Sequence, residues 1–337
     1  MKRLLSIVIS LTILALLYWK IDFSKLLPVF AGSDPIWMTL SLAMVVPLTL
    51  LTARRLQQLM PRAGLLSFSE ANRLILVASV LNLVLPSKMG DLAKAFFMRD
   101  RGQLPGSLAL SLVVFEKACD MLSLLLWCAF GLVWIKLSGA RALESFAAPS
   151  WLAERGLAGS DLFFWTSALV VGSSLALGLL LLGSETFARL FFDLAVRFAP
   201  GKIGAKFSKL GASWSEMHGY FWASKRRFAV VAGTSVFIWF LHLLQIWMFI
   251  LALRAHAPFL ANLALSPLAI LAGLLPLTFA GVGTRDAALV LFYAPFFSAP
   301  TAAALGLLCT ARYLLPALGG LPFASRYLTR LRLAPAA

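Results

Sequence analysis

Charged side chains are scarce in this chain of 337 residues: they make up 13% of it, and Asp and Glu together number only 14. A soluble domain typically carries about 25% charged residues and about 45–50% apolar ones. Here 61% of the residues are hydrophobic, and the mean hydropathy is +0.88. This composition leaves too little polar surface to cover a water-soluble globule, so it excludes soluble domains and predicts an integral membrane protein.

Cysteine and histidine are also rare, with three residues of each. Cys119, Cys128 and Cys309 lie in apolar stretches, and their odd number and spacing fit neither a disulfide framework nor a metal site. We interpret them as buried packing residues. The sequence contains no cluster of histidines and no nucleotide-binding motif, so we expect no metal and no cofactor.

The charges that are present are mostly basic and give a formal net charge of +16. A basic surface is one mark of nucleic-acid binding. These residues, however, fall in short segments between long apolar runs, where membrane proteins have their cytoplasmic Lys and Arg. We therefore expect no nucleic-acid partner.

Several apolar runs are long enough to cross a bilayer, which takes about 20 residues. They are Leu4–Trp19, Ile36–Thr52, Ser107–Ile135, Leu162–Gly183, Phe228–Leu253 and Thr301–Pro322. The first run resembles a secretory signal, but Lys20 and Asp22 separate it from any cleavage site, so we interpret it as an uncleaved span. The runs predict an all-α membrane protein with about six full transmembrane helices.

Two further apolar stretches, Leu74–Pro86 and Leu268–Ala280, are too short to cross a bilayer, and a polar break that contains glycine follows each. Stretches of this length are typically re-entrant or interfacial. A second short apolar piece follows each break, at Leu92–Met98 and at Ala287–Phe297. We therefore predict two re-entrant broken helices.

This topology gives one polytopic domain with both termini in the cytoplasm, because most of the 30 Lys and Arg residues then lie on the cytoplasmic side. Its halves are residues 1–183 and 228–337. The two broken helices enter from opposite sides, as in the inverted repeats of transporters. The distance from proline to acid differs between the two breaks, so a true inverted repeat stays an open question.

The segment of residues 184–227 links the two halves. Within Phe187–Ala199, charged residues repeat every four positions among phenylalanines and leucines, which predicts an amphipathic helix lying on the membrane surface. The basic residues that follow it fit contact with anionic headgroups. Ordinary positive-inside charge is the alternative interpretation.

Charged residues inside the spans are candidates for a functional site, because each costs at least about 2.5–3.5 kcal/mol at the centre of a membrane helix. Glu116 and Asp120 lie one helical turn apart and share a face, with Lys117 beside them. Arg312 lies deep in the last span with no acid next to it in sequence. It needs a partner in space, and we predict Asp286.

The two breaks are stronger candidates for the site. Asp91 and Thr284 each follow a glycine turn and fit the N-cap position of a helix. The N-terminus of a helix presents free backbone N–H groups that suit a phosphate. Arg285, next to Gly281 and Gly283, adds a guanidinium that matches phosphate oxygens. We predict that these residues bind an anionic headgroup, although a tight turn alone would also explain the glycines.

Three motifs resemble those of the lysylphosphatidylglycerol synthase transmembrane-region family. Residues 82–94 resemble its N-x-x-x-P-x-x-x-G-[ED]-x-x-[RK] signature, residues 115–120 its E-R-x-x-D motif, and residues 276–286 its P-x-x-x-G-G-x-G-x-R-E segment. This chain departs from the family pattern at Lys94, Lys117, Asp286 and Ala280. The candidate substrate-binding residues are Asn82, Pro86, Gly90, Asp91, Lys94, Glu116, Lys117, Asp120, Pro276, Gly281, Gly283, Arg285, Asp286 and Arg312.

The resemblance implies a protein of the bacterial inner membrane that flips an anionic phospholipid, a polyprenyl-phosphate or a hopanoid-type lipid. We expect a stand-alone member without an aminoacyl-transferase domain. Its expected partners are membrane lipids with an anionic headgroup, lipid-synthesis enzymes and a second copy of the chain.

Two other functions stay open from the sequence. One is an intramembrane lipid-modifying transferase, in which Glu116, Asp120 and Asp91 hold Mg²⁺ and a diphosphate. The other is a non-catalytic scaffold of a lipid-synthesis complex, which would not need buried arginines.

Overall fold

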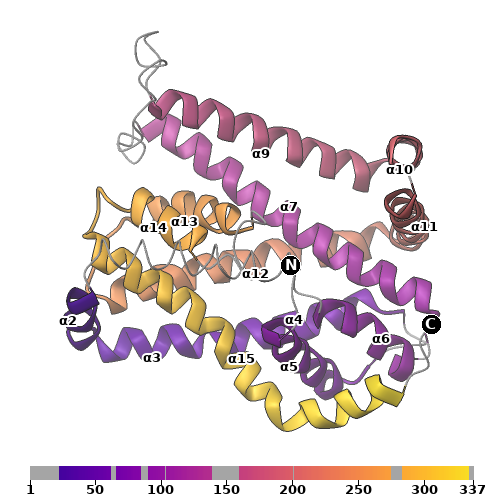
Figure 1. The fold of residues 1–337 in the computed structure, drawn as a ribbon, viewed down its shortest axis with the longest axis horizontal. Helices are drawn as coiled ribbons and strands as arrows, with labels where there is room; N and C mark the ends of the chain where they lie inside the picture. The colour runs from indigo at the N-terminus through magenta and orange to yellow at the C-terminus, as the bar shows by residue number, and fades with distance from the viewer. Residues whose placement is uncertain are drawn as a thin grey trace. The chain divides into compact units, whose positions relative to one another are not determined.

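The computed structural model describes residues 23–61, 66–84, 90–102, 104–138, 159–199, 201–274 and 283–333. All regular secondary structure in these ranges is helical (Figure 1), which confirms the predicted all-α class. The elements are η1 (Phe23–Lys25), α2 (Leu26–Ala31), α3 (Pro35–Ala43), α4 (Val45–Leu59), α5 (Phe68–Val84), α6 (Gly90–Gly102), α7 (Gly106–Ser138), α9 (Gly159–Gly183), α10 (Glu185–Phe198), α11 (Lys202–Trp222), α12 (Lys225–Ala252), α13 (Phe259–Gly273), α14 (Thr284–Phe292) and α15 (Ala299–Leu333).

Within the described ranges, 5 helical segments are long and apolar enough to cross a membrane. They are Pro35–Leu59 (α3 and α4), Gly106–Ser138 (α7), Asp161–Gly183 (in α9), Lys225–Ala252 (α12) and Ala299–Ser325 (in α15). Each corresponds to one of the predicted runs, and large apolar side chains such as Trp165 and Leu169 are exposed on them, as a lipid environment favours. The chain is a multi-pass membrane protein. The predicted span Leu4–Trp19 lies outside the described residues.

Each of the two short apolar stretches contributes to a pair of helices. α5 precedes α6 and α13 precedes α14, and within each pair the two helices pack against each other. The breaks at residues 85–89 and 275–282 lie outside the described residues. The helices expected before and after each break are present, and both the break and the re-entry into the membrane stay predictions.

The first helix of each pair begins earlier than its apolar run. α5 begins at Phe68 because Ser67 and Glu70 form a capping box: Ser67 Oγ accepts from the Glu70 amide at 3.2 Å, and Glu70 Oε2 accepts from the Ser67 amide at 3.4 Å. α13 begins at Phe259, immediately after Pro258. Capping residues, and not the edge of the apolar run, therefore determine where α5 starts.

The helices group into two compact units. Unit 1 comprises Met1–Pro47, Leu124–Ser173 and Phe240–Leu315, and unit 2 comprises Leu48–Ser123, Ser174–Trp239 and Pro316–Ala337. Unit 1 contains α13 and α14, and unit 2 contains α5 and α6. Each unit thus contains one helix–break–helix pair.

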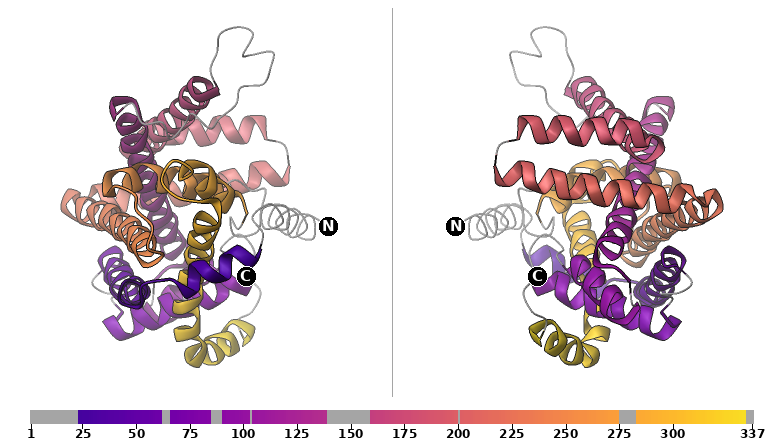
Figure 2. Two further views of the ribbon diagram at one scale, coloured as in Figure 1. Left: turned by 90° about the vertical axis from the view of Figure 1, so that its left-hand side faces the viewer. Right: turned by 90° about the vertical axis from the view of Figure 1, so that its right-hand side faces the viewer.

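In unit 2, α10 and α11 lie side by side (Figure 2). Ser184 caps α10 by accepting a hydrogen bond from the Phe187 amide at 3.2 Å. Ala188 and Phe192 are buried, whereas Leu190 is exposed. The predicted amphipathic helix is confirmed, and its contact with the membrane surface stays a prediction.

Candidate functional site

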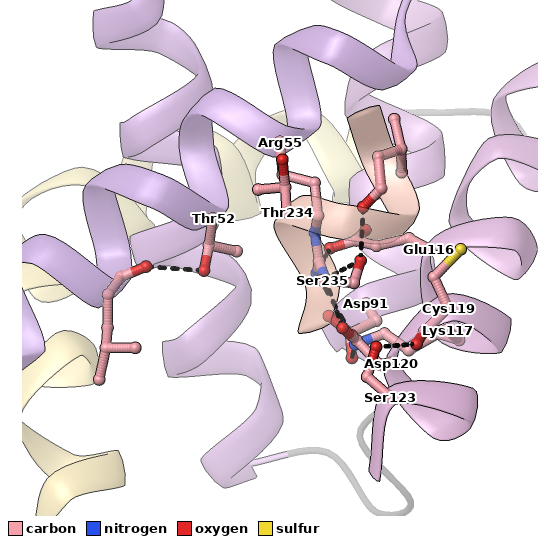
Figure 3. Close-up of polar contacts among 12 residues, drawn as sticks. Thr52, Arg55, Asp91, Glu116, Lys117, Cys119, Asp120, Ser123, Thr234 and Ser235 are labelled. Carbon is pink, nitrogen blue, oxygen red and sulfur yellow. Dashed lines mark hydrogen bonds and ion pairs between the residues drawn. The ribbon is translucent and has the colours of Figure 1, made fainter. Parts of the chain in front are cut away.

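Charged side chains from three helices of unit 2 form a closed ring of ion pairs. Its members, in order around the ring, are Arg55, Glu116, Lys94, Asp91, Lys117 and Asp120, and Asp120 pairs again with Arg55. Figure 3 labels all of these residues except Lys94. Bases and acids alternate, so each acid contacts two bases and each base contacts two acids. The ring as a whole is formally neutral.

Arg55 on α4 bridges both acids of α7. Its Nη2 donates to Glu116 Oε1 at 2.7 Å and to Asp120 Oδ2 at 3.3 Å, and its Nη1 pairs with Asp120 Oδ1. Nη1 also donates at 2.9 Å to the hydroxyl of Ser235 on α12. The Arg55 side chain points toward these partners, whereas Thr52, one turn earlier, bonds its own helix (Figure 3).

Two lysines close the other side of the ring. Lys94 Nζ on α6 lies 3.0 Å from Asp91 Oδ1 and 2.8 Å from Glu116 Oε2. Lys117 Nζ on α7 lies 2.9 Å from Asp91 Oδ2 and 3.6 Å from Asp120 Oδ2. The contact between Lys117 and Asp120 is the longest in the ring.

The ring has a buried side and an exposed edge. The side chains of Arg55, Lys94 and Glu116 are 3%, 3% and 1% exposed. Those of Lys117 and Asp120 are 44% and 22% exposed. A ligand would therefore reach the ring first at its longest ion pair.

Gly90 allows the ring to form, because it lets α6 start close to α5. A Cβ at this position would lie 2.4 Å from the Ala78 carbonyl oxygen and 2.7 Å from Asn82 Oδ1. Asn82 Oδ1 is buried and has no hydrogen-bond partner within the described ranges. Asp91 follows in the first turn of α6, where its carboxylate binds the two lysines. The predicted N-cap role of Asp91 is wrong.

A second charged group lies in unit 1, at the start of α14. Arg285 Nη2 donates to Asp286 Oδ1 at 2.6 Å, to the Gly306 carbonyl oxygen at 3.0 Å and to Thr310 Oγ1 at 2.7 Å. Both charged residues are buried. Arg285 thus ties α14 to α15, and most of its hydrogen-bonding capacity is used within the protein.

Asp286 also holds the first turn of α14. Its Oδ2 accepts from the Gly283 amide at 3.1 Å. Gly283 is the N-cap, with φ of 102°, a conformation that favours glycine. Thr284 is therefore the first residue of the helix and not its cap as predicted. A Cβ at Gly306 would lie 2.8 Å from Asp286 Oδ1, so this glycine lets α15 approach the carboxylate.

Arg312 does not pair with Asp286, so that prediction is wrong. Its Nη2 donates to the Tyr313 hydroxyl at 3.0 Å, its Nη1 makes a long contact of 3.5 Å with the His242 carbonyl oxygen, and its Nε is buried without a hydrogen-bond partner in the described part of the chain. Asp286 instead forms an ion pair with Arg285, its neighbour in sequence.

The structure thus brings most of the predicted residues into two groups. Gly90, Asp91, Lys94, Glu116, Lys117, Asp120 and Asn82 lie in and beside the ring of unit 2, and Gly283, Arg285, Asp286 and Arg312 lie in unit 1. Pro86, Pro276 and Gly281 lie outside the described residues.

The sequence analysis missed Arg55. Arg55 follows the end of the predicted span Ile36–Thr52, which places it among the cytoplasmic charges between spans, whereas it lies within α4 and is 2% exposed. The sequence signal for its role was that two acids share a helix face with one base, Lys117, next to them, so that a further base was needed from elsewhere in the chain.

The fold and the site together define a multi-pass helical membrane protein with ion pairs buried among its spans. The chain matches the lysylphosphatidylglycerol synthase TM region family over residues 3–320, and it belongs to this family. It is also 23% identical over 309 residues to a UPF0104 membrane protein of Methanocaldococcus jannaschii, a match that covers 90% of this chain and 87% of that protein. The resemblance in the motifs is confirmed, and the family indicates a role related to membrane lipids.

Proposed function

We propose that the protein is a flippase that moves an anionic lipid between the two leaflets of the membrane. The observation that carries this proposal is the closed ring of Arg55, Glu116, Lys94, Asp91, Lys117 and Asp120, which lies among apolar helices. Buried ion pairs are weak evidence for stability, because well-packed apolar residues of similar volume are often as stable. A ring of this kind is better explained by a ligand that replaces some of its ion-pair partners when it binds.

The exposed edge of the ring suggests how the exchange begins. Lys117 Nζ is held loosely by Asp120, at 3.6 Å, and its side chain is partly exposed. A phosphate oxygen that arrives there replaces Asp120 as a partner of Lys117. Asp120 keeps Arg55 as a counter-charge, so neither acid nor base is left unpaired at this step. The headgroup thus gains a cationic partner inside an apolar region, where an isolated charge would be costly.

The transferase alternative needs the same carboxylates for a different purpose. Mg²⁺ binds through carboxylates and substrate phosphates. In this structure Glu116, Asp120 and Asp91 each contact two basic side chains. A divalent cation would have to displace these bases, which favours transport over catalysis. We propose that the protein is not an enzyme.

The proposal is tested by reconstituting the purified protein in liposomes that carry fluorescent phosphatidylglycerol or fluorescent phosphatidylcholine. Loss of fluorescence on adding a membrane-impermeant quencher measures how fast the lipid changes leaflet. We expect the wild-type protein to move phosphatidylglycerol, and Lys117→Gln to slow this movement at least about tenfold, in line with the loss of one charged contact of about 1.5–3 kcal/mol.

Lys136→Gln is the matched control, because Lys136 is an exposed lysine on the same helix and lies outside the ring. It should move lipid at the wild-type rate. No movement of either lipid by the wild-type protein, or equal rates for wild type and Lys117→Gln, would contradict the proposal.

A further inference from the structure

Among the described residues of unit 1, the buried basic side chains outnumber the buried acidic ones. Arg285, Asp286 and Arg312 are 4%, 1% and 4% exposed, and Arg285 takes up the carboxylate of Asp286. Among the described residues of this unit, no other acid is buried. Among the residues that the structure describes, Arg312 is therefore a buried cation that forms no ion pair.

The surroundings of Arg312 leave part of its guanidinium unused. The group lies over the ring of Tyr313, 4.9 Å from its centroid, and donates to the hydroxyl of the same residue at 3.0 Å. Its Nε has no partner within the described ranges, although it is buried. A buried donor without a partner is costly, and a buried charge without a counter-ion is more so. One bound anion would supply both the acceptor for Nε and the counter-charge for the guanidinium.

The position of Arg312 indicates what the anion is. The residue lies within Ala299–Ser325, a segment long and apolar enough to span a membrane. Tyr313, which contacts the guanidinium, is 40% exposed, and Leu315, three residues further along the helix and on the same face as Arg312, is 36% exposed, so an aromatic and an apolar side chain are exposed on this part of the span. Arginine matches the oxygens of a phosphate in geometry and charge.

We propose that Arg312 binds the phosphate of an anionic lipid whose acyl chains lie along this apolar surface. Arg312 Nε donates to the phosphate, and the Tyr313 hydroxyl lies within reach of the same group. The subsite is built from residues of unit 1, whereas the ring is built from residues of unit 2. The inference that an anion binds Arg312 stands on the contacts of this residue, and the inference that the anion is a lipid rests on the proposed function.

The test measures binding and not movement. Purified protein in detergent is freed of lipid, and its thermal unfolding is followed while phosphatidylglycerol, phosphatidylcholine or inorganic phosphate is added. A ligand that binds the folded state raises the melting temperature in proportion to the logarithm of its concentration. We expect phosphatidylglycerol to stabilise the wild-type protein, and Arg312→Leu to weaken its apparent affinity at least about tenfold, which is about 1.4 kcal/mol.

Two further variants separate binding from a structural role. Arg254→Gln, at an exposed arginine of the same unit, should keep the wild-type affinity. Arg312→Lys should bind more weakly than wild type but better than Arg312→Leu, because an ammonium keeps the charge and loses the forked contact. Without lipid, Arg312→Leu should be as stable as wild type or more so, because it removes an uncompensated charge.

A large loss of stability in lipid-free Arg312→Leu, with unchanged phosphatidylglycerol affinity, would make Arg312 a structural residue and overturn the inference. An equal response to inorganic phosphate or to phosphatidylcholine would overturn the assignment to an anionic lipid. Wild-type binding through Arg312 without movement in liposomes would contradict the proposed flippase and leave this subsite standing.

Discussion

Arg55 and Glu116 lie 61 positions apart in the sequence and form an ion pair of 2.7 Å whose side chains are 3% and 1% exposed. The pair joins α4 to α7, and each partner has a second contact in the ring, Arg55 with Asp120 and Glu116 with Lys94. Removing one member therefore changes the charge balance of the whole ring, and not of one pair only.

This relationship predicts a particular pattern of stability. Arg55→Leu and Glu116→Leu should each lower the free energy of unfolding by about 3–5 kcal/mol, because each leaves one uncompensated charge in a buried place. The double variant should lose clearly less than the sum, since Lys94, Asp91, Lys117 and Asp120 then balance one another. Thermal unfolding of the four proteins in detergent measures this difference.

Arg54→Leu serves as the control, because Arg54 is an exposed neighbour on the same helix that donates a hydrogen bond to Gln57 and lies outside the ring. It should change stability by less than about 0.5 kcal/mol. If the losses for Arg55 and Glu116 simply add, the two residues do not act as a pair.

A second prediction concerns the approach of α15 to α14. Gly306→Ala should destabilise the protein by about 1–3 kcal/mol, the usual cost of overfilling a packed site, because the new Cβ would meet the Asp286 carboxylate. Relief of that contact would also lengthen or break the hydrogen bond from Arg285 to the Gly306 carbonyl oxygen. The measurement is again thermal unfolding in detergent.

Gly233→Ala on α12 is the matched substitution, since a Cβ there has no heavy atom within 4 Å. Alanine is a better helix former than glycine by about 1 kcal/mol, so this variant should be neutral or slightly more stable. Equal behaviour of the two alanine variants would show that the close approach at Gly306 does not matter.

The sequence predicted the fold better than the ion pairs, and the reason is physical. Length and hydropathy are local properties of a span, so the predicted spans within the described ranges lie within a few residues of the observed helical segments, except at the C-terminal end of Pro35–Leu59, which extends past the predicted Thr52. The partner of a buried charge depends on which helices pack together. The position of Arg55 after a predicted span therefore indicated a loop residue, whereas it pairs with Glu116. Asp286 was predicted to pair with Arg312, whereas it pairs with Arg285.

The start of α5 shows a smaller error of the same kind. The apolar run suggested Leu74, but Ser67 and Glu70 already satisfy the first turn at Phe68. The capping box was present in the sequence, and it would have given the correct start.

His218 on α11 should make stability depend on pH. Burial lowers the pKa of its imidazole below the ordinary value of 6.5, against a smaller opposing effect of Glu185. The unfolded chain then binds the proton more readily than the folded one, so stability falls as the pH drops below about 6.5. His218→Phe, which keeps a ring stacked near Trp222, should lose less stability than wild type between pH 7.5 and pH 5.5.

The control for pH is His256→Phe, at an exposed histidine. It should keep the wild-type dependence of the melting temperature on pH. An unchanged dependence in His218→Phe would mean that other groups cause the loss of stability in acid.

The last prediction concerns orientation in the membrane, which the charge distribution suggests and labelling can decide. We expect the position of Ser87 and the segment of residues 184–227 to face the cytoplasm, and the position of Ser145 to face outward, because most Lys and Arg residues then lie inside. Single cysteines at these positions are practical, because the native Cys119, Cys128 and Cys309 are buried.

In intact cells, a membrane-impermeant thiol reagent should label Ser145→Cys and should leave Ser87→Cys and Ser208→Cys unlabelled until the membrane is opened. Ser208 is exposed on α11 and serves as the marker of the segment 184–227. If the stretch from Leu74 to Pro86 crossed the membrane, every later loop would be inverted, and Ser208→Cys would be labelled from outside while Ser145→Cys would not. That result would replace the re-entrant topology by a full crossing and would put the basic segment on the outer face, against the positive-inside rule.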